Sequence, residues 1–162
     1  MLNSIYDIIL DYLRKNNTEA IILDMDNTII ARKDPLPSLN CLNWVDDMKN
    51  SGIKICIASN NSNLNRVASV SEYLDLPAVI RSLKPLPFVI RKTVKEILQV
   101  SHENVLMVGD QFFSDILGGN ILGLKTVHVE PLAPELSTIR KYVIQIDKKI
   151  FLIILFREIN LT

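Results

Sequence analysis

Cysteine and long apolar runs, two features that often reveal where a chain works, are scarce in this sequence. Only 2 of its 162 residues are cysteines, Cys41 and Cys56, and neither lies in a CxxC pair or a Cys/His cluster. This scarcity excludes a disulfide framework and a cysteine-ligated zinc site, and it favours a reduced compartment. The longest uncharged apolar run, Ile150–Phe156, is far shorter than the ~18 residues that span a bilayer. We therefore expect a cytoplasmic chain that is at most peripheral at a membrane surface.

The sequence also lacks an excess of charge of one sign. It has 18 Lys and Arg residues against 18 Asp and Glu residues, so its net charge gives no reason to expect nucleic acid as a partner. Internal repeats and Gly- or Ser-rich linkers are absent as well. With 48% hydrophobic residues, the chain is able to bury a sizeable core. We expect one domain over residues 1–162, with its core at about 18–131 and a C-terminal tail at 132–162.

Five short apolar runs, most of them rich in Ile and Val, alternate with amphipathic stretches. We expect the runs to be strands, and they cover Ala20–Met25, Ile53–Ala58, Ala78–Arg81, Asn104–Val108 and Lys125–Val129. The stretches predict helices over Leu39–Asn50, from a cap at Asn61 or Ser62 to about Leu74, from Pro85 to about Val100, and over Ser114–Leu122. This alternation predicts a three-layer, Rossmann-like α/β/α fold around a five-stranded parallel sheet.

Carboxylates follow two of these predicted strands. Asp24 and Asp26 lie at the end of the first run, and Asp110 follows the fourth. In an open parallel sheet, ligands bind beyond the carboxyl ends of the strands, so we expect these acids to converge. Each alone is usually a solvated turn residue or a helix cap, and three unrelated acids remain the plain alternative. Together their repulsion requires a cation, and hard oxygen ligands favour Mg²⁺.

Two further strand ends carry groups suited to phosphate. Ser59 follows the second run with a hydroxyl, and Asn60 leads into a predicted helix whose first N–H groups can face an anion. Lys84 precedes Pro85 and supplies a mobile positive charge. Taken singly, each has an ordinary explanation as a helix cap or a surface residue. In this order, at these strand ends, they indicate a phosphoryl-transfer site.

These residues form four ordered motifs: the apolar strand and DxDxT segment Ile21–Thr28, then Ser59, then Lys84, then Gly109–Asp115. In these motifs the chain resembles the haloacid dehalogenase-like (HAD) phosphohydrolases over about residues 20–131. DxDxT alone is a weak pattern, whereas the ordered quartet is specific. The segments IILDMDNTI, SNN, KP and GDQxxxDxxGGNxxG are similar, more narrowly, to the capless YqeG-type branch (subfamily III). That branch is related to the phosphatidylglycerophosphate phosphatases.

The resemblance implies a catalytic role for two of the acids and a metal site for all of them. Asp24 is the expected nucleophile, which forms an aspartyl-phosphate, and Asp26 is the expected acid and base for the leaving group and the attacking water. The expected cofactor is Mg²⁺, held by Asp24, Asp110 and the backbone carbonyl of Asp26. Asp115 is expected to support these ligands or to act through water.

The resemblance also implies which residues bind the phosphate. Ser59, Asn60 and Lys84 are expected to hold the oxygens of the transferring group while charge develops on them. Thr28 is expected to brace the loop after the first strand. The expected activity is therefore Mg²⁺-dependent hydrolysis of a phosphomonoester.

The spacing of the motifs leaves no room for a cap domain. A loop and one helix fill the interval from Asp24 to Ser59, and a helix with a short strand fills the interval from Ser59 to Lys84. An open site admits a large substrate, and the resemblance favours a phospholipid head group such as phosphatidylglycerophosphate. Soluble sugar phosphates, nucleotides or phosphoproteins are the alternative substrates. A non-catalytic binding or scaffold protein is the alternative of another class.

The C-terminal tail is expected to add weak contact with an anionic membrane. Lys148 and Lys149 precede the apolar run Ile150–Phe156, and Arg157 follows it. Basic and apolar side chains together favour shallow, salt-sensitive binding at an interface. The alternative is that the same segment packs its apolar side on the core.

Overall fold

A parallel sheet forms the centre of the fold. The computed structural model describes residues 1–133, and the predicted basic and apolar tail segment lies outside the described residues. The sheet has five strands in the order β3-β2-β1-β4-β5, and each neighbouring pair is parallel. The strands are β1 (Ala20–Leu23), β2 (Lys54–Ser59), β3 (Ala78–Ile80), β4 (Val105–Gly109) and β5 (Lys125–His128). The predicted fold class, with the first strand at the centre, is confirmed.

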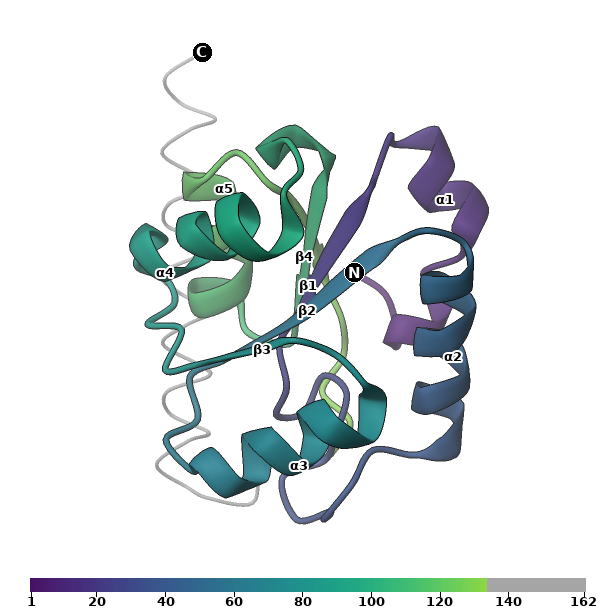
Figure 1. Ribbon diagram of the computed structural model, residues 1–162, viewed down its shortest axis with the longest axis vertical. Coiled ribbons are helices and arrows are strands. Elements are labelled where there is room, and N and C mark those ends of the chain that lie inside the picture. The colour runs from purple at the N-terminus through teal and green to yellow at the C-terminus, as the bar shows by residue number, and fades with distance from the viewer. Residues whose placement is uncertain (134–162) are drawn as a thin grey trace.

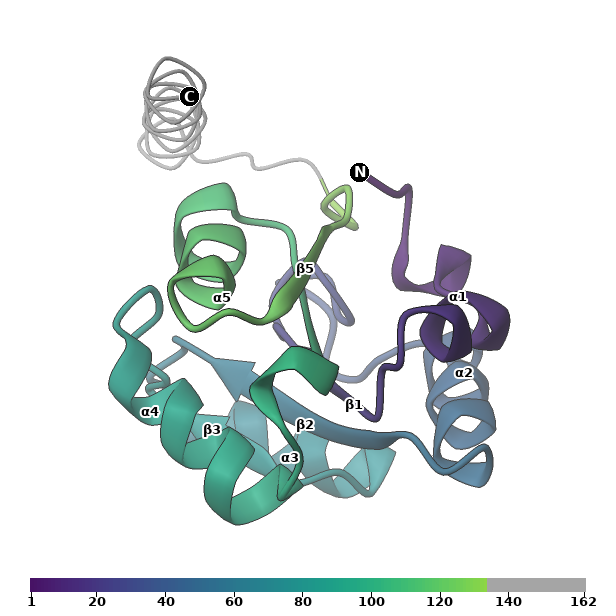
Figure 2. The same ribbon diagram turned by 90° about the horizontal axis from the view of Figure 1, so that it is seen from above.

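Helices cover both faces of this sheet. The α-helices are α1 (Leu10–Lys15), α2 (Leu39–Asn50), α3 (Leu64–Leu74), α4 (Pro87–Lys92) and α5 (Gly118–Ile121). Short 3₁₀ segments are η1 (Ile5–Asp7) and η3 (His102–Asn104), and π-helical turns are η2 (Thr93–Leu98), which continues α4, and η4 (Phe112–Leu117), which leads into α5. The views in Figure 1 and Figure 2 place α1 and α2 on one side of the sheet and α4 and α5 on the other.

Alternate side chains of the strands build two hydrophobic cores, one on each face of the sheet. In β1, Ile21 and Leu23 belong to one core, whereas Ala20 and Ile22 belong to the other. Residues of α1, α2 and α3 complete the first core, and residues of α4 and η2 complete the second. Because both faces are covered, β1 is apolar and buried along its whole length.

The start of α3 differs from the sequence prediction. Asn63 caps this helix, because its Oδ1 accepts the N–H of Arg66 at 3.1 Å. The predicted caps, Asn61 and Ser62, lie before the helix. The side chain of Asn61 is engaged elsewhere, since its Oδ1 accepts the N–H of Asn63 at 2.8 Å and its Nδ2 donates to a carboxylate of the site. A contact distant in sequence therefore decides where the helix begins.

The connections that follow the carboxyl ends of β1, β2 and β3 are short. They cover residues 24–38, 60–63 and 81–86, and none of them carries an inserted domain. Among residues 1–133, no helix combines the length and the apolar character needed to cross a membrane. The functional side chains of these connections are therefore held directly against the edge of the sheet.

Candidate active site

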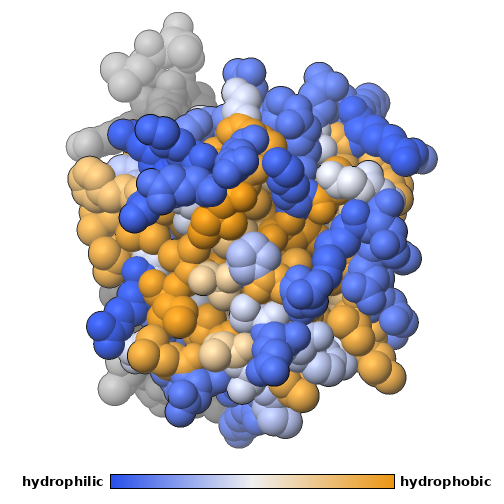
Figure 3. Space-filling model, in the orientation of Figure 1, coloured by the Kyte–Doolittle hydropathy of each residue, from blue (hydrophilic) through white to orange (hydrophobic). Residues whose placement is uncertain are grey.

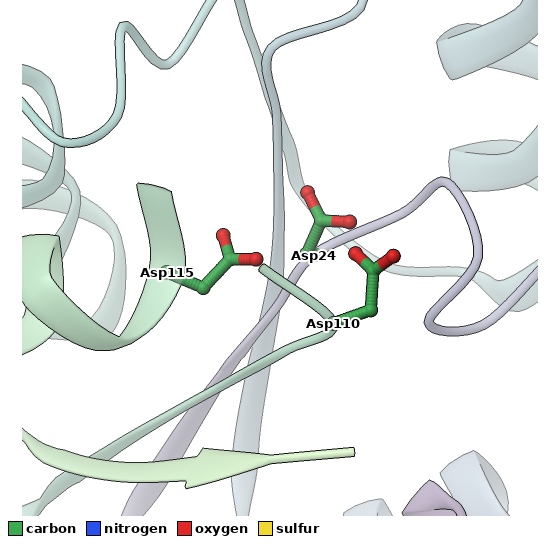
Figure 4. A group of neighbouring side chains, drawn as sticks. All are labelled: Asp24, Asp110 and Asp115. Atoms are coloured by element: carbon green, nitrogen blue, oxygen red, sulfur yellow. The ribbon is translucent and has the colours of Figure 1, made fainter. Parts of the chain in front are cut away.

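Three carboxylates meet beyond the carboxyl ends of the two central strands. Asp24 directly follows β1, Asp110 directly follows β4, and Asp115 lies in η4. One carboxylate oxygen of each lies within 4.8 Å of the others, and Figure 4 shows the three groups side by side. The parallel pairing of β1 with β4 brings Asp24 and Asp110 together, because both strands end at the same edge of the sheet.

A glycine makes room for the third carboxylate. Asp115 is fully buried, and its Oδ2 accepts a hydrogen bond from the backbone N–H of Gln111 at 3.1 Å. A Cβ atom on Gly109 would stand only 2.2 Å from that same Oδ2. The close approach of this carboxylate to the backbone therefore requires glycine at the end of β4. It gives a physical reason for the Gly-Asp pair of the fourth motif.

Lys84 carries the positive charge of this cluster. Its Nζ lies 2.7 Å from Oδ1 of Asp24 and 2.7 Å from Oδ1 of Asp115, and it donates to the backbone oxygen of Ala58 at 2.7 Å. Burial opposes the charge on Lys84, but the neighbouring charges of Asp115 and Asp24 outweigh it and raise the pKa above its ordinary value. The lysine is therefore a buried cation held between Asp24 and Asp115.

The three carboxylates carry more negative charge than Lys84 neutralises. Burial raises the pKa of Asp24 to about 6, although the charge of Lys84 opposes the shift. Burial, together with repulsion from Asp24 and Asp115, raises the pKa of Asp110 to about 8. The Oδ1 atom of Asp110 is buried and has no hydrogen-bond partner among the described residues. A buried carboxylate oxygen without a donor, inside a cluster of acids, fits a divalent cation that prefers hard oxygen ligands.

The carboxylate of Asp26 is held by a different set of side chains. Nε and Nη2 of Arg66 both donate to its Oδ1 at 3.3 Å, and Nδ2 of Asn61 donates to its Oδ2 at 2.7 Å. Nη1 of Arg32 lies 3.6 Å from the same Oδ2. Asn27 follows in the left-handed region, with a φ of 67° that asparagine tolerates, and turns the chain back. The two acids of the first motif therefore have separate surroundings.

Ser59 and Thr28 lie buried beside the cluster. Ser59 ends β2, and its Oγ accepts the backbone N–H of Asn61 at 3.1 Å. Thr28 donates from Oγ1 to Oδ2 of Asp24 at 3.4 Å, a long hydrogen bond that ties its loop to the end of β1. Ser59 therefore lies at the end of the strand that pairs with β1, and Thr28 contacts Asp24 directly, while their phosphate-binding and loop-bracing roles stay predictions.

The side chain of Asn60 holds the backbone of Lys84. Its Nδ2 donates to the Lys84 carbonyl at 3.0 Å, and its Oδ1 accepts the Lys84 N–H at 3.0 Å and the hydroxyl of Ser82 at 2.8 Å. The amide thus uses its donor and its acceptor on the same residue. A phosphate-binding role for Asn60, as predicted from the sequence, is left to its backbone N–H.

Sequence reasoning missed three side chains that hold the site together. Arg66 and Asn61 bind the carboxylate of Asp26, as described above. His128 of β5 donates from Nε2 to the backbone oxygen of Asp110 at 3.0 Å, and its ring stacks on Phe112 with ring centroids 4.0 Å apart. In the sequence these residues are only a helix residue, a cap candidate and a strand residue. Their partners lie far along the chain, so no local pattern identifies them.

Comparisons with known proteins converge on one family. A family model described as HAD-hydrolase-like matches residues 83–131 of this chain. The protein of Bacillus subtilis (strain 168) named "Probable phosphatase YqeG" is 32% identical over 149 residues. This similarity spans 92% of this chain and 86% of the bacterial protein.

Solved structures share the fold at lower identity. An uncharacterized protein from Listeria monocytogenes serotype 4b has a TM-score of 0.57 at 22% identity, covering 74% of this chain and 85% of that chain. A p-nitrophenyl phosphatase from Archaeoglobus fulgidus has a TM-score of 0.52 at 16% identity, covering 68% of this chain and 85% of that chain. At these identities the likeness establishes the fold alone.

Proposed function

This chain belongs to the HAD-like family and is a HAD-type phosphatase, and from that premise we propose that it hydrolyses phosphomonoesters through an aspartyl-phosphate on Asp24. The observation that carries the proposal is the cluster of Asp24, Asp110 and Asp115, in which one carboxylate oxygen of each acid lies within 4.8 Å of the others and Lys84 contacts Asp24 and Asp115. Buried acids that repel one another destabilise a fold. Such clusters are typical of sites that act on charged substrates.

The proposed reaction has two steps that share one proton carrier. First, a carboxylate oxygen of Asp24 attacks phosphorus and forms an O–P bond, while the bond to the leaving oxygen breaks and Asp26 gives that oxygen a proton. Second, Asp26 takes a proton from water as the water oxygen bonds to phosphorus and the bond to Asp24 breaks. With its pKa raised to about 6, Asp24 is still mainly ionised at neutral pH and is able to attack.

Three groups are proposed to bind the transferring phosphoryl group. Lys84 keeps its charge because the adjacent carboxylates raise its pKa, and it lies 2.7 Å from the proposed nucleophile Asp24. Ser59 offers a buried hydroxyl at the end of β2, and Asn60 offers its backbone N–H. Fixed donors of this kind stabilise the charge that develops on the phosphoryl oxygens.

The carboxylates of Asp24 and Asp110 and the backbone carbonyl of Asp26 are proposed to hold Mg²⁺, with Asp115 contributing through water. Support comes from the buried Oδ1 of Asp110, which has no partner among the described residues, and from the all-oxygen donor set. The chemistry that the cation supplies when bound is neutralisation of the repulsion between the nucleophile and the phosphate. Lys84 supplies only one of the positive charges that the site requires.

Among substrates we propose a phosphate on a large amphiphilic molecule, such as the phosphatidylglycerophosphate head group. Support comes from the short connections around the site, which carry no inserted domain within residues 1–133. It also comes from three exposed apolar side chains close to Lys84 in the sequence, Leu83, Leu86 and Phe88, of which Phe88 is 71% exposed. Figure 3 shows apolar side chains gathered over the region of β3 and α4.

We further propose that the protein is cytoplasmic and visits the membrane surface weakly through its tail. The support is the sequence pattern of Lys148, Lys149 and Arg157 around Ile150–Phe156. Co-sedimentation with anionic vesicles at low and high salt, with and without residues 148–162, tests this. Equal, negligible binding of both forms would contradict it.

The activity is tested with p-nitrophenyl phosphate and then with a panel of lipid, sugar, nucleotide and peptide phosphates. We expect turnover that EDTA abolishes and Mg²⁺ restores, and the highest kcat/KM for a lipid phosphate. A preference for a sugar, nucleotide or peptide phosphate would refute the lipid proposal while leaving the phosphatase. No turnover of any phosphate, together with no trapping of beryllofluoride, would favour a binding or scaffold protein.

A further inference from the structure

Arg66, in the first turn of α3, joins the helix to the loop that follows β1. Its Nη1 donates to the backbone oxygen of Asp34 at 2.6 Å, and its Nη2 donates to the backbone oxygen of Ala31 at 3.1 Å. Its Nε and Nη2 also donate to Oδ1 of Asp26, both at 3.3 Å. Two backbone carbonyls of the loop therefore anchor the guanidinium group, and Nε and Nη2 are directed at one carboxylate oxygen of Asp26.

The second oxygen of Asp26 is held from the other side. Nδ2 of Asn61 donates to Oδ2 at 2.7 Å, and Nη1 of Arg32 lies 3.6 Å from the same atom. The side chain of Asp26 is 10% exposed and that of Arg66 is 17% exposed, so solvent screens their ion pair little. With donors on both oxygens, the orientation of this carboxylate is fixed by its neighbours.

We propose that Arg66 is a positioning residue for proton transfer by Asp26. The inference rests on the proposed function, in which Asp26 protonates the leaving oxygen and then deprotonates water. A proton carrier contributes only when it lies within hydrogen-bond reach of the atom that it serves, so its orientation affects the rate directly. Arg66 fixes that orientation through a planar fork, which the single ammonium of lysine does not reproduce.

The loop anchors explain why arginine is placed in this turn of α3. Asn63 caps the helix by accepting the N–H of Arg66 itself at 3.1 Å, which fixes the backbone from which the long side chain starts. The carbonyls of Ala31 and Asp34 then fix its far end. An Arg66→Met variant removes all four contacts, whereas Arg66→Lys retains a charge without the fork.

The test uses a series of aryl and alkyl phosphates that differ in the basicity of the leaving oxygen. A weakly basic leaving group departs without a proton, whereas a strongly basic one needs the proton from Asp26. Because kcat/KM reports the steps up to departure of the alcohol, we expect Arg66→Met to lower it about 100-fold for an alkyl phosphate. For 2,4-dinitrophenyl phosphate we expect the same variant to lose less than about 5-fold in kcat/KM. The dependence of kcat/KM on the basicity of the leaving oxygen therefore becomes steeper in the variant.

Two further variants make the result specific. Arg66→Lys should show an intermediate slope, and added guanidinium ion should restore part of the activity of Arg66→Ala toward the alkyl phosphate. Arg14→Met is the matched control, because Arg14 lies on α1 with its side chain 69% exposed, and it should leave the slope unchanged. Circular dichroism and thermal denaturation of each variant establish that it is folded.

The outcomes separate the inference from the function on which it rests. If Asp26→Asn steepens the dependence and Arg66→Met and Arg66→Lys lower kcat/KM equally for all substrates, Arg66 is merely structural and the inference is overturned. If Asp26→Asn itself leaves the slope unchanged, the proposed acid role of Asp26 fails. Should Arg66→Met not fold, the slope of Arg66→Lys and the guanidinium rescue of a folded Arg66→Ala decide between the two roles.

Discussion

Two lysine–aspartate pairs in this molecule have the same length, but the pKa values of the two acids shift in opposite directions. Nζ of Lys84 lies 2.7 Å from Oδ1 of Asp24, and Nζ of Lys49 lies 2.7 Å from Oδ2 of Asp75. The side chains of the first pair are 2% and 8% exposed, and those of the second are 31% and 93% exposed. Burial raises the pKa of Asp24 to about 6, whereas the hydrogen bond and charge of Lys49 lower the pKa of Asp75.

The comparison teaches that burial and neighbouring charges, rather than the length of the ion pair, decide in which direction the pKa of the acid shifts. The pair of Lys49 with Asp75 connects the end of α2 to the residue after α3 and is surrounded by solvent, which screens it. The pair of Lys84 with Asp24 is desolvated and is crowded by Asp115. A buried charge cluster of this kind is retained at a cost in stability, which is typical of a functional site.

The largest expected effect comes from removing the proposed nucleophile. Asp24→Asn should lower kcat at least about 10³-fold, because the amide neither attacks phosphorus nor carries charge for the cation. The fold should survive, since Lys84 keeps its contact with Asp115 and the side-chain volume hardly changes. Hydrolysis of p-nitrophenyl phosphate and trapping with beryllofluoride measure the effect. Asp75→Asn is the matched control, and substantial activity in Asp24→Asn would show that another group is the nucleophile.

Removing each lysine in turn should change the free energy of unfolding by very different amounts in the two pairs. Lys84→Met leaves two buried carboxylates without their cation and should lower the free energy of unfolding of the metal-free protein by about 3–5 kcal/mol. Lys49→Met removes a solvent-exposed contact and should change little. Denaturant unfolding in the presence of EDTA measures both variants. Equal losses in the two variants would contradict the distinction drawn from burial.

The stability of the metal-free protein should depend on pH through the buried acids. The pKa of Asp24 is raised from 3.8 to about 6 and that of Asp110 from 3.8 to about 8, so the folded state binds more protons than the unfolded state in this range. Stability from these groups is complete below about pH 4 and is lost as the pH rises toward 8. The loss is on the order of 1.4 kcal/mol for each unit of pKa shift, reduced where the two acids interact.

Asp75 should show the opposite sign, because its lowered pKa gives stability above its ordinary pKa that is lost as the pH falls. Thermal denaturation of wild type, Asp110→Asn and Asp75→Asn measures these contributions, between pH 4 and 8 with EDTA or with Mg²⁺ for the buried acids and from about pH 4 down to about pH 2 for Asp75. Mg²⁺ should raise the Tm more at pH 8 than at pH 5, because a cation binds the ionised acids. An equal rise at both pH values would contradict a metal site at these carboxylates.

The smallest expected effect concerns the support of Lys84 rather than its charge. Asn60→Asp replaces the donor to the Lys84 carbonyl by a second acceptor and should lower kcat roughly 10-fold, the equivalent of ~1.4 kcal/mol. Ser38→Ala is the matched control, since Ser38 caps a different helix, α2, by accepting the backbone N–H of Cys41 at 3.2 Å. It should lower the free energy of unfolding by about 1 kcal/mol and leave kcat unchanged. Unchanged kcat in Asn60→Asp would remove Asn60 from the site.

Much of the fold was predictable because its signals are local. The runs Ala20–Met25 and Ile53–Ala58 are apolar on both sides, which is typical of strands buried in a parallel sheet, and the structure pairs β1 with β2 and β4. The end of α3 was found near Leu74, whereas its start was misplaced. A helix cap depends on a single hydrogen bond. Asn61 binds Asp26 instead of capping the helix, and Asn63 caps it two residues later.

The sequence by itself determined which polar groups stand at the strand ends: Asp24, Ser59, Lys84 and Asp110 each follow an apolar run, and the topology of a parallel sheet brings such ends together. Only the tertiary structure decided what each group contacts. Lys84 lies between two acids, Asn60 holds its backbone, and Arg66 orients Asp26 from 40 positions away. The physical reason is that hydrophobic burial leaves a period along the chain, whereas a hydrogen bond between two distant side chains leaves none.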